Sequence, residues 1–62
     1  METKHTKVLR IAAVMDRVGL RRTSIYDYIK KGNFPPPIRI GEKAVAWREA
    51  DIERWISERE VA

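Results

Sequence analysis

The chain has 62 residues, no cysteine, and 13 basic against 9 acidic side chains, which give a formal net charge of +4. A chain this short folds as one domain with a thin core, and without thiols it forms neither a disulfide nor a thiolate metal site. A single histidine, His5, argues against a zinc site. No apolar run approaches the about 20 residues that span a bilayer, and no apolar segment typical of a signal peptide is recognised, so we expect a cytoplasmic protein.

The basic charge is unevenly distributed along the chain. Residues 1–31 carry eight basic and three acidic side chains, whereas residues 49–62 carry two basic and five acidic ones. A polyanion is attracted to the first segment and repelled by the last. We therefore expect an anionic partner to bind the first part of the chain.

The N-terminal segment, residues 1–8, is polar and shows no periodicity, so we expect a flexible arm ahead of a folded domain at residues 9–60. The apolar residues that follow recur at helical spacing: Ile11, Val14, Met15 and Val18. This spacing predicts a short amphipathic helix. Gly19 follows directly, and because glycine adopts positive φ without a steric penalty, it predicts the end of that helix.

The stretch GLRRTSIYDYIKKG predicts a second short helix that starts near Arg22. Its apolar residues lie at i, i+3 and i+4: Ile25, Tyr28 and Ile29. Gly32 ends it, after two lysines whose charge suits the helix dipole. Two short helices joined by a tight turn with a glycine have the outline of a helix-turn-helix.

A proline-rich connector, NFPPP, follows the second helix, and because proline cannot continue a helix, an extended segment is expected there. In the stretch IRIGEKAVAW, Ile38 and Ile40 alternate around a polar residue, which predicts a short strand. Val45 and Trp47 alternate with alanine and predict a second strand, after a turn at residues 41–43. The two strands form a hairpin that must lean on the helices, because an isolated hairpin is only marginally stable.

The last segment, READIERWISERE, has apolar residues at helical spacing and acids in its first turn, which predicts a third helix. The expected fold is therefore mainly α with a small β-hairpin, in the order helix, helix, hairpin, helix: a winged helix-turn-helix. Trp47 and Trp55 lie on apolar faces, which favours core packing over stacking on nucleic-acid bases.

The second helix has a polar face opposite its apolar side. We call this set the polar face: Arg22, Thr23, Tyr26, Asp27 and Lys30. Arginine binds guanine O6 and N7 bidentately, and threonine contacts a thymine methyl group or a phosphate. Tyrosine and lysine suit phosphate oxygens, which position a protein on DNA without reading its sequence.

Further candidates flank this face and lie in the hairpin. The start of the helix offers N–H groups to a phosphate beside Arg21 and Ser24. Arg39 and Lys43 flank the tight turn of the hairpin, as in a wing that touches DNA. The full candidate set for DNA binding is Arg21, Arg22, Thr23, Ser24, Tyr26, Asp27, Lys30, Lys31, Arg39 and Lys43. The alternative is a solvated cationic face and turn, on which Thr23 or Ser24 acts only as a helix cap.

In their order, these residues resemble the AlpA family of small prophage regulators, which belongs to the MerR-like winged-helix group alongside phage excisionases. The shared pattern is a Gly-Leu turn, a hydroxyl-rich Ile-Tyr helix, a Phe-Pro corner, a hairpin that ends in Trp, and a helix with a second Trp. Here it is carried by Gly19-Leu20, Thr23-Ser24-Ile25-Tyr26, Gly32 with Phe34-Pro35, Ala46-Trp47 and Trp55-Ile56. The resemblance covers residues 9–59 and implies sequence-specific DNA binding, with the second helix as recognition helix.

Two positions depart from the family pattern. Arg21 stands where family members often carry a serine, so the resemblance supplies no helix cap. Asp27 stands where a basic residue is common, and an acid that faces a phosphate is repelled. Asp27 can instead accept a hydrogen bond from cytosine N4, or it can pair with Lys30 or Lys31. The target sequence therefore does not transfer from relatives.

The leading interpretation is a prophage-type transcriptional regulator that binds double-stranded DNA with its second helix in the major groove and its hairpin on the backbone. Further copies on adjacent sites are compatible with it. An excisionase-like factor that bends DNA for an integrase needs the same surface and stays an alternative. A second alternative is a protein-interaction module that uses the acids of the last segment: Glu49, Asp51, Glu53, Glu58 and Glu60.

The sequence gives no indication of an enzyme. It has no Ser/His/Asp set, no carboxylate pair in an expected cleft and no glycine-rich phosphate loop. We accordingly expect no cofactor, no small-molecule substrate, no metal and no membrane partner.

Overall fold

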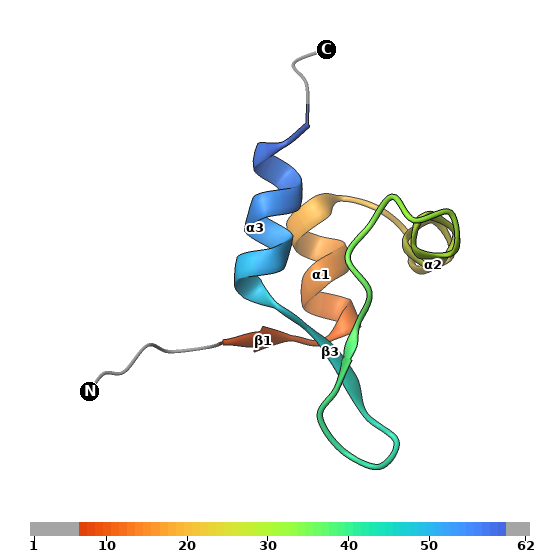
Figure 1. Ribbon diagram of the computed structural model, residues 1–62, viewed down its shortest axis with the longest axis vertical. Helices are drawn as coiled ribbons and strands as arrows, with labels where there is room; N and C mark the ends of the chain where they lie inside the picture. Colours follow the sequence, from red (N-terminus) through yellow and green to blue (C-terminus); the bar gives the residue numbers. More distant parts are fainter. Residues whose placement is uncertain (1–6, 60–62) are drawn as a thin grey trace, which may run out of the picture.

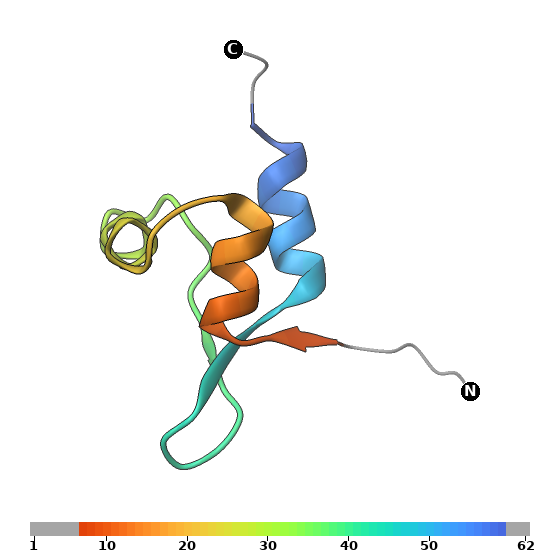
Figure 2. The same ribbon diagram turned by 180° about the vertical axis from the view of Figure 1, so that it is seen from behind.

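The computed structural model describes residues 7–59 and contains three helices and three short strands. In chain order they are β1 (Val8–Leu9), α1 (Ile11–Val18), α2 (Arg22–Lys30), β2 (Ile38–Arg39), β3 (Val45–Arg48) and α3 (Glu49–Ser57). Helices α1 and α3 lie side by side, whereas α2 runs across them and is seen end-on (Figure 1 and Figure 2). The hairpin of β2 and β3 projects away from the helices. The predicted winged helix-turn-helix, with its order of helix, helix, hairpin and helix, is confirmed.

Glycines with positive φ follow both helices of the helix-turn-helix, as their sequence positions predicted. Gly19 has φ 73° after α1, and Gly32 has φ 80° after α2. The N–H of Gly32 donates to the Ile29 carbonyl at 3.0 Å, and that of Asn33 donates to the Tyr28 carbonyl at 2.8 Å. This pair of bonds is a Schellman motif, which satisfies carbonyl groups that the end of a helix leaves without partners. It turns the chain sharply from α2 into the connector.

The core takes one side chain from every element except β2, and one from the connector. Its buried members are Leu9, Val14, Ile25, Phe34, Trp47 and Ile52. Burying one large apolar side chain contributes about 1.5–3 kcal/mol. Because domains of this size are only marginally stable, each of these residues carries a large share of the folding free energy. The burial of Val14, Ile25 and Ile52, one in each helix, confirms the inward faces that the helical spacing predicted.

Both tryptophans hold the connector that follows α2. The indole N–H of Trp47 donates to the Pro35 carbonyl at 2.9 Å, and that of Trp55 donates to the Asn33 carbonyl at 2.7 Å. The buried Phe34 ring packs edge-on against Trp55, with ring centroids 4.8 Å apart. Since the connector begins where α2 ends, these contacts fix α2 relative to β3 and α3. Trp47 is fully buried and Trp55 is half-buried, which agrees with their expected packing role.

Strand β1 was not predicted from the sequence. It pairs antiparallel with β3, with Val8 opposite Arg48 and Leu9 opposite Trp47, so the sheet has the order β1-β3-β2. A two-residue strand is too short to show an alternating pattern, and its pairing depends on a partner about 40 residues further along the chain. The central strand β3 is therefore flanked on both sides.

The folded part of the chain begins earlier than the expected boundary at residue 9. Val8 lies in β1, and the Lys7 carbonyl accepts a hydrogen bond from the Glu49 N–H at 2.9 Å. These two residues contact the end of β3 and the start of α3. The rest of the expected arm, residues 1–6 with His5, lies outside the described residues, as do residues 60–62.

The two predicted strands of the hairpin are present as β2 and β3, but aliphatic side chains at its outer end are exposed. Trp47 is inaccessible to solvent, but Val45 is 37% exposed and Ile40 is 43% exposed. The hairpin extends beyond the helices (Figure 1), so alternate residues at its outer end have no surface to pack against. Ala46, which neighbours Val45 in β3, is inaccessible to solvent.

Candidate nucleic-acid interface

The polar face of α2 points to solvent because the opposite side of the helix is held in the core. Ile25 is inaccessible, and Tyr28 and Ile29 pack half-buried against the same cluster. The exposed candidates on and around α2 are Arg21, Arg22, Thr23, Tyr26, Asp27, Lys30 and Lys31, and Ser24 is half-buried. The orientation that the apolar spacing predicted for α2 is thus present in the structure.

The start of α2 has no side-chain cap. Arg21 occupies the N-cap position in an extended conformation, with φ −79° and ψ 160°, and makes no capping hydrogen bond. The first helical hydrogen bond runs from the Ile25 N–H to the Arg21 carbonyl at 3.0 Å. The alternative in which Thr23 or Ser24 caps the helix is therefore not found. Uncapped N–H groups beside two arginines suit an anion such as a phosphate.

The one acid of the polar face is paired within the helix. The Lys31 ammonium lies 3.1 Å from the Asp27 carboxylate, at i, i+4 spacing. Of the two lysine partners considered from the sequence, the structure selects Lys31. Both side chains are exposed, so the pair contributes little to stability. Its effect is electrostatic, because it reduces the repulsion between Asp27 and an approaching polyanion.

The polar face of α2 adjoins the hairpin at Tyr26. The Tyr26 ring, which is 41% exposed, meets the buried Trp47 ring edge-on, with centroids 6.1 Å apart and planes at 63°. Arg39 in β2 and Lys43 in the turn are both exposed. The candidates of α2 and those of the hairpin therefore belong to neighbouring elements, as a two-part DNA contact requires.

One exposed residue beside these candidates was not among them. Val45 lies directly opposite Arg39 in the β2–β3 ladder. Residues directly opposite each other share a sheet face, and so do residues two positions apart on one strand. Arg39, Val45 and Trp47 therefore lie on one face of the hairpin. The alternation in the sequence predicted only that Val45 lies in a strand, and no signal in the sequence shows that the helices end before reaching it.

The acids of α3 are partly engaged within the chain. Arg17 of α1 forms ion pairs with Glu49, at 2.9 Å, and with Glu53. The hydrogen bond to Glu49 raises the pKa of the Arg17 guanidinium above its ordinary value. Two of the acids considered for a basic partner thus join α3 to α1 instead.

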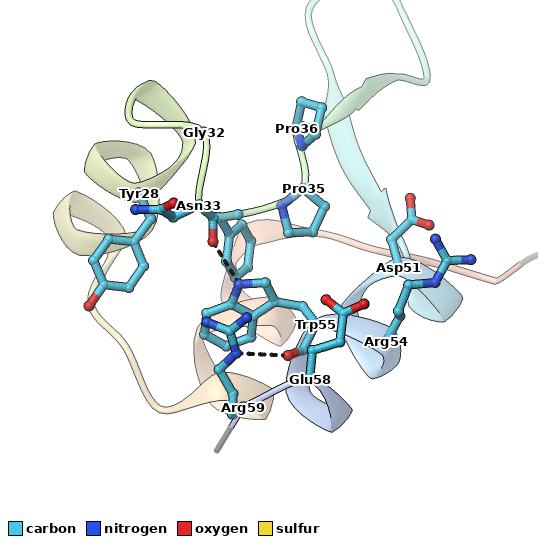
Figure 3. A pocket seen from close by; sticks show the side chains of 11 residues that line it. Tyr28, Gly32, Asn33, Pro35, Pro36, Asp51, Arg54, Trp55, Glu58 and Arg59 are labelled. Atoms are coloured by element: carbon cyan, nitrogen blue, oxygen red, sulfur yellow. Dashed lines mark hydrogen bonds between the residues drawn. The ribbon is translucent and has the colours of Figure 1, made fainter.

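A groove of about 680 Å³ lies between the connector and α3, with Trp55 at its centre (Figure 3). The Arg59 guanidinium lies 4.4 Å from the centroid of the Trp55 ring, and Arg59 Nε donates to the Trp55 carbonyl at 3.1 Å. None of the candidate DNA-binding residues lines this groove. The groove and the polar face of α2 are therefore separate surfaces.

Among residues 7–59, no helix is both long enough and apolar enough to cross a membrane. The same residues contain no group of three or more His, Cys, Asp or Glu side chains arranged to hold a metal ion.

Comparisons with known proteins show a matching family and two relatives to which the chain is similar. The family model described as "Prophage CP4-57 regulatory protein (AlpA)" matches residues 7–60. The "Uncharacterized protein ORF88" of Enterobacteria phage P4 is 42% identical over 53 residues, which cover 86% of this chain and 60% of the phage protein. The "DNA-binding transcriptional activator AlpA" of Escherichia coli (strain K12) is 36% identical over 59 residues, which cover 86% of this chain and 84% of that protein.

Proposed function

Because the chain belongs to the family of AlpA prophage regulatory proteins, as its residue pattern predicted, we propose that it regulates transcription by sequence-specific binding to double-stranded DNA. The E. coli relative is named as a DNA-binding transcriptional activator. This protein acts in the cytoplasm by occupying a promoter region, and its function is binding without a chemical step. In this role α2 enters the major groove, as the second helix of a helix-turn-helix does.

The observation that carries the proposal is the exposed polar face of α2 beside a basic hairpin. Arg22 and Thr23 lie in the first turn of α2, which is the part of a recognition helix that reaches base edges. Arg22 is suited to a guanine and Thr23 to a thymine methyl group. Lys30, at the other end of α2, is placed for a phosphate.

The remaining candidates hold the protein on the DNA backbone. Arg21, at the uncapped start of α2, lies beside N–H groups that can donate hydrogen bonds to a phosphate. Arg39 and Lys43 place positive charge on the hairpin, where it meets the backbone next to the groove that α2 occupies. Lys31 is less available, because it pairs with Asp27.

A second part of the proposal concerns further copies of the protein. A single small module buries only about 600–1,000 Å² of its surface on DNA, which limits both affinity and specificity. Several copies on adjacent sites therefore provide the selectivity that one copy lacks.

A gel-shift titration tests the proposal. One duplex comes from the genomic neighbourhood of the gene, and the other has the same composition in shuffled order; both are titrated at about 50 and about 200 mM salt. We expect tighter binding to the genomic duplex, a steep loss of affinity with salt, and stepped shifts from several copies. The absence of binding to either duplex at low salt contradicts the proposal.

A further inference from the structure

The hairpin has two faces, and we propose that the face with Arg39 and Val45 contacts the DNA. On this face, Val45 makes an apolar contact with the DNA. This inference rests on the proposed function and deepens it, because it adds a contact residue and sets the orientation of the hairpin.

The pairing of β2 with β3 separates the two faces. Arg39 lies opposite Val45, and Ile38 lies opposite Ala46. Since opposed residues share a face and neighbours alternate, Arg39 and Val45 lie on one side and Ile38 on the other. Ile40 continues the side of Ile38, because it is two residues further along and its N–H bonds to the Ala44 carbonyl at 2.9 Å. The two exposed aliphatic residues, Val45 and Ile40, thus lie on opposite faces.

The Val45 face is the one that adjoins the recognition helix. Trp47 shares this face, is inaccessible to solvent, and receives the edge contact of Tyr26 from α2. Val45 is two residues from Trp47, a step of about 7 Å along a strand, in the direction that leaves the core. The exposed parts of Tyr26 and Val45 therefore line the angle between α2 and the hairpin, and Arg39 stands beside them.

This combination of side chains matches the chemistry of the DNA surface. The thymine methyl group and the deoxyribose carbons are apolar, and each lies close to a charged phosphate. An apolar side chain directly opposite an arginine can contact a sugar or methyl group while the arginine binds the adjacent phosphate. Among the described residues, Tyr26, Ile40 and Val45 are the exposed large hydrophobic side chains, and two of the three lie in this angle.

Matched substitutions on the two faces test the orientation. Val45→Lys and Ile40→Lys each place a cation at an exposed aliphatic position of the same hairpin. A cation that gains one phosphate contact steepens the slope of log affinity against log salt by about 0.9. We expect this steeper slope, with tighter binding to random DNA, for Val45→Lys and an unchanged slope for Ile40→Lys. Urea titrations of both variants establish that each is folded.

A third variant tests the apolar contact itself. Val45→Thr keeps the shape of the side chain and replaces one methyl group with a hydroxyl. Loss of one buried methyl group corresponds to about a fourfold loss of affinity. We expect that loss on the genomic duplex with no change in salt slope, because no charge is altered, whereas Ile40→Thr leaves the affinity unchanged.

Three results overturn the inference. A steeper slope for Ile40→Lys alone means that the hairpin presents its other face. If the salt slope steepens equally in both lysine variants, or stays unchanged in both, no single face of the hairpin contacts the DNA. If the wild-type protein binds no duplex at low salt, the proposed function itself is overturned. Because the wild-type titration comes before the variants, failure of the proposed function is distinguished from failure of the proposed hairpin orientation.

Discussion

The exposed ring of Tyr26 stands edge-on against the buried ring of Trp47, with centroids 6.1 Å apart. Trp47 in turn donates its indole N–H to the Pro35 carbonyl, in the connector that follows α2. One chain of contacts therefore joins the exposed side of α2, the core strand β3 and the end of α2. Tyr26 has two separable roles in consequence: its ring helps to orient α2, and its hydroxyl is available to DNA.

Two substitutions at Tyr26 distinguish these roles. Tyr26→Phe removes only the hydroxyl, so we expect DNA affinity to fall by about 0.5–1.5 kcal/mol, the net value of one hydrogen bond, with unchanged stability. Tyr26→Ala also removes the ring contact, so the free energy of unfolding should fall by about 0.5–1.5 kcal/mol or more. Binding titrations and urea unfolding of both variants measure the two effects. Wild-type affinity in Tyr26→Phe would show that the hydroxyl makes no contact with DNA.

Arg22 is expected to read a base rather than a phosphate. Arg22→Ala should cost about 1–3 kcal/mol on a specific site and much less on random DNA, because a bidentate contact to guanine discriminates between bases. Arg22→Lys should not restore specificity, since an ammonium cannot form the two parallel hydrogen bonds of a guanidinium. Titrations on specific and random duplexes give both values. If the loss is the same on the two duplexes, Arg22 contacts a phosphate.

Lys43, in the turn of the hairpin, is expected to contact the DNA backbone. Lys43→Ala should weaken binding on every sequence and lower the salt slope by about 0.9, the value for one phosphate. Arg54→Ala is the matched control, because it removes one exposed cation from α3, where Arg54 lines the groove around Trp55. Affinities measured over a range of salt concentrations give the slopes. An unchanged slope for Lys43→Ala would remove the turn from the interface.

The helices were predictable from the sequence because their signals are local. Four apolar residues at helical spacing followed by Gly19 mark α1, and Gly32 marks the end of α2. The same spacing placed Ile25 in the core and left the opposite side of α2 polar and exposed. Local signals of this kind need no knowledge of the remaining fold. The fold class followed from their order along the chain.

The features that were missed depend on contacts between distant segments. Strand β1 forms because Val8 and Leu9 pair with β3, and α1 is linked to α3 because Arg17 forms an ion pair with Glu49. The exposure of Val45 depends on where the helices end relative to the hairpin, which alternation along a strand does not encode. The assignment of individual residues to bases or phosphates depends in the same way on a partner outside the chain. It therefore stays a prediction.

The turn between α1 and α2 depends on the backbone conformation of Gly19, and this gives a test of stability. Gly19 has φ 73°, and a Cβ built there would meet nothing within 4 Å. Gly19→Ala therefore creates no clash, and its cost is that of the left-handed conformation, about 1–2 kcal/mol. Gly41→Ala is the control, because Gly41 has no positive φ and its Cβ would lie 3.6 Å from the Ala44 Cβ, an ordinary contact.

Urea unfolding measures the difference between the two alanine variants. Gly19→Ala should lower the midpoint without changing the slope m, and Gly41→Ala should leave the midpoint near that of the wild type. Because Gly19 only sets the path of the chain, the folded fraction of Gly19→Ala should bind DNA with wild-type affinity and salt slope. Equal midpoints for the two variants would show that positive φ at Gly19 is not what holds the turn. A loss of affinity at full folding would mean that the turn itself contacts DNA.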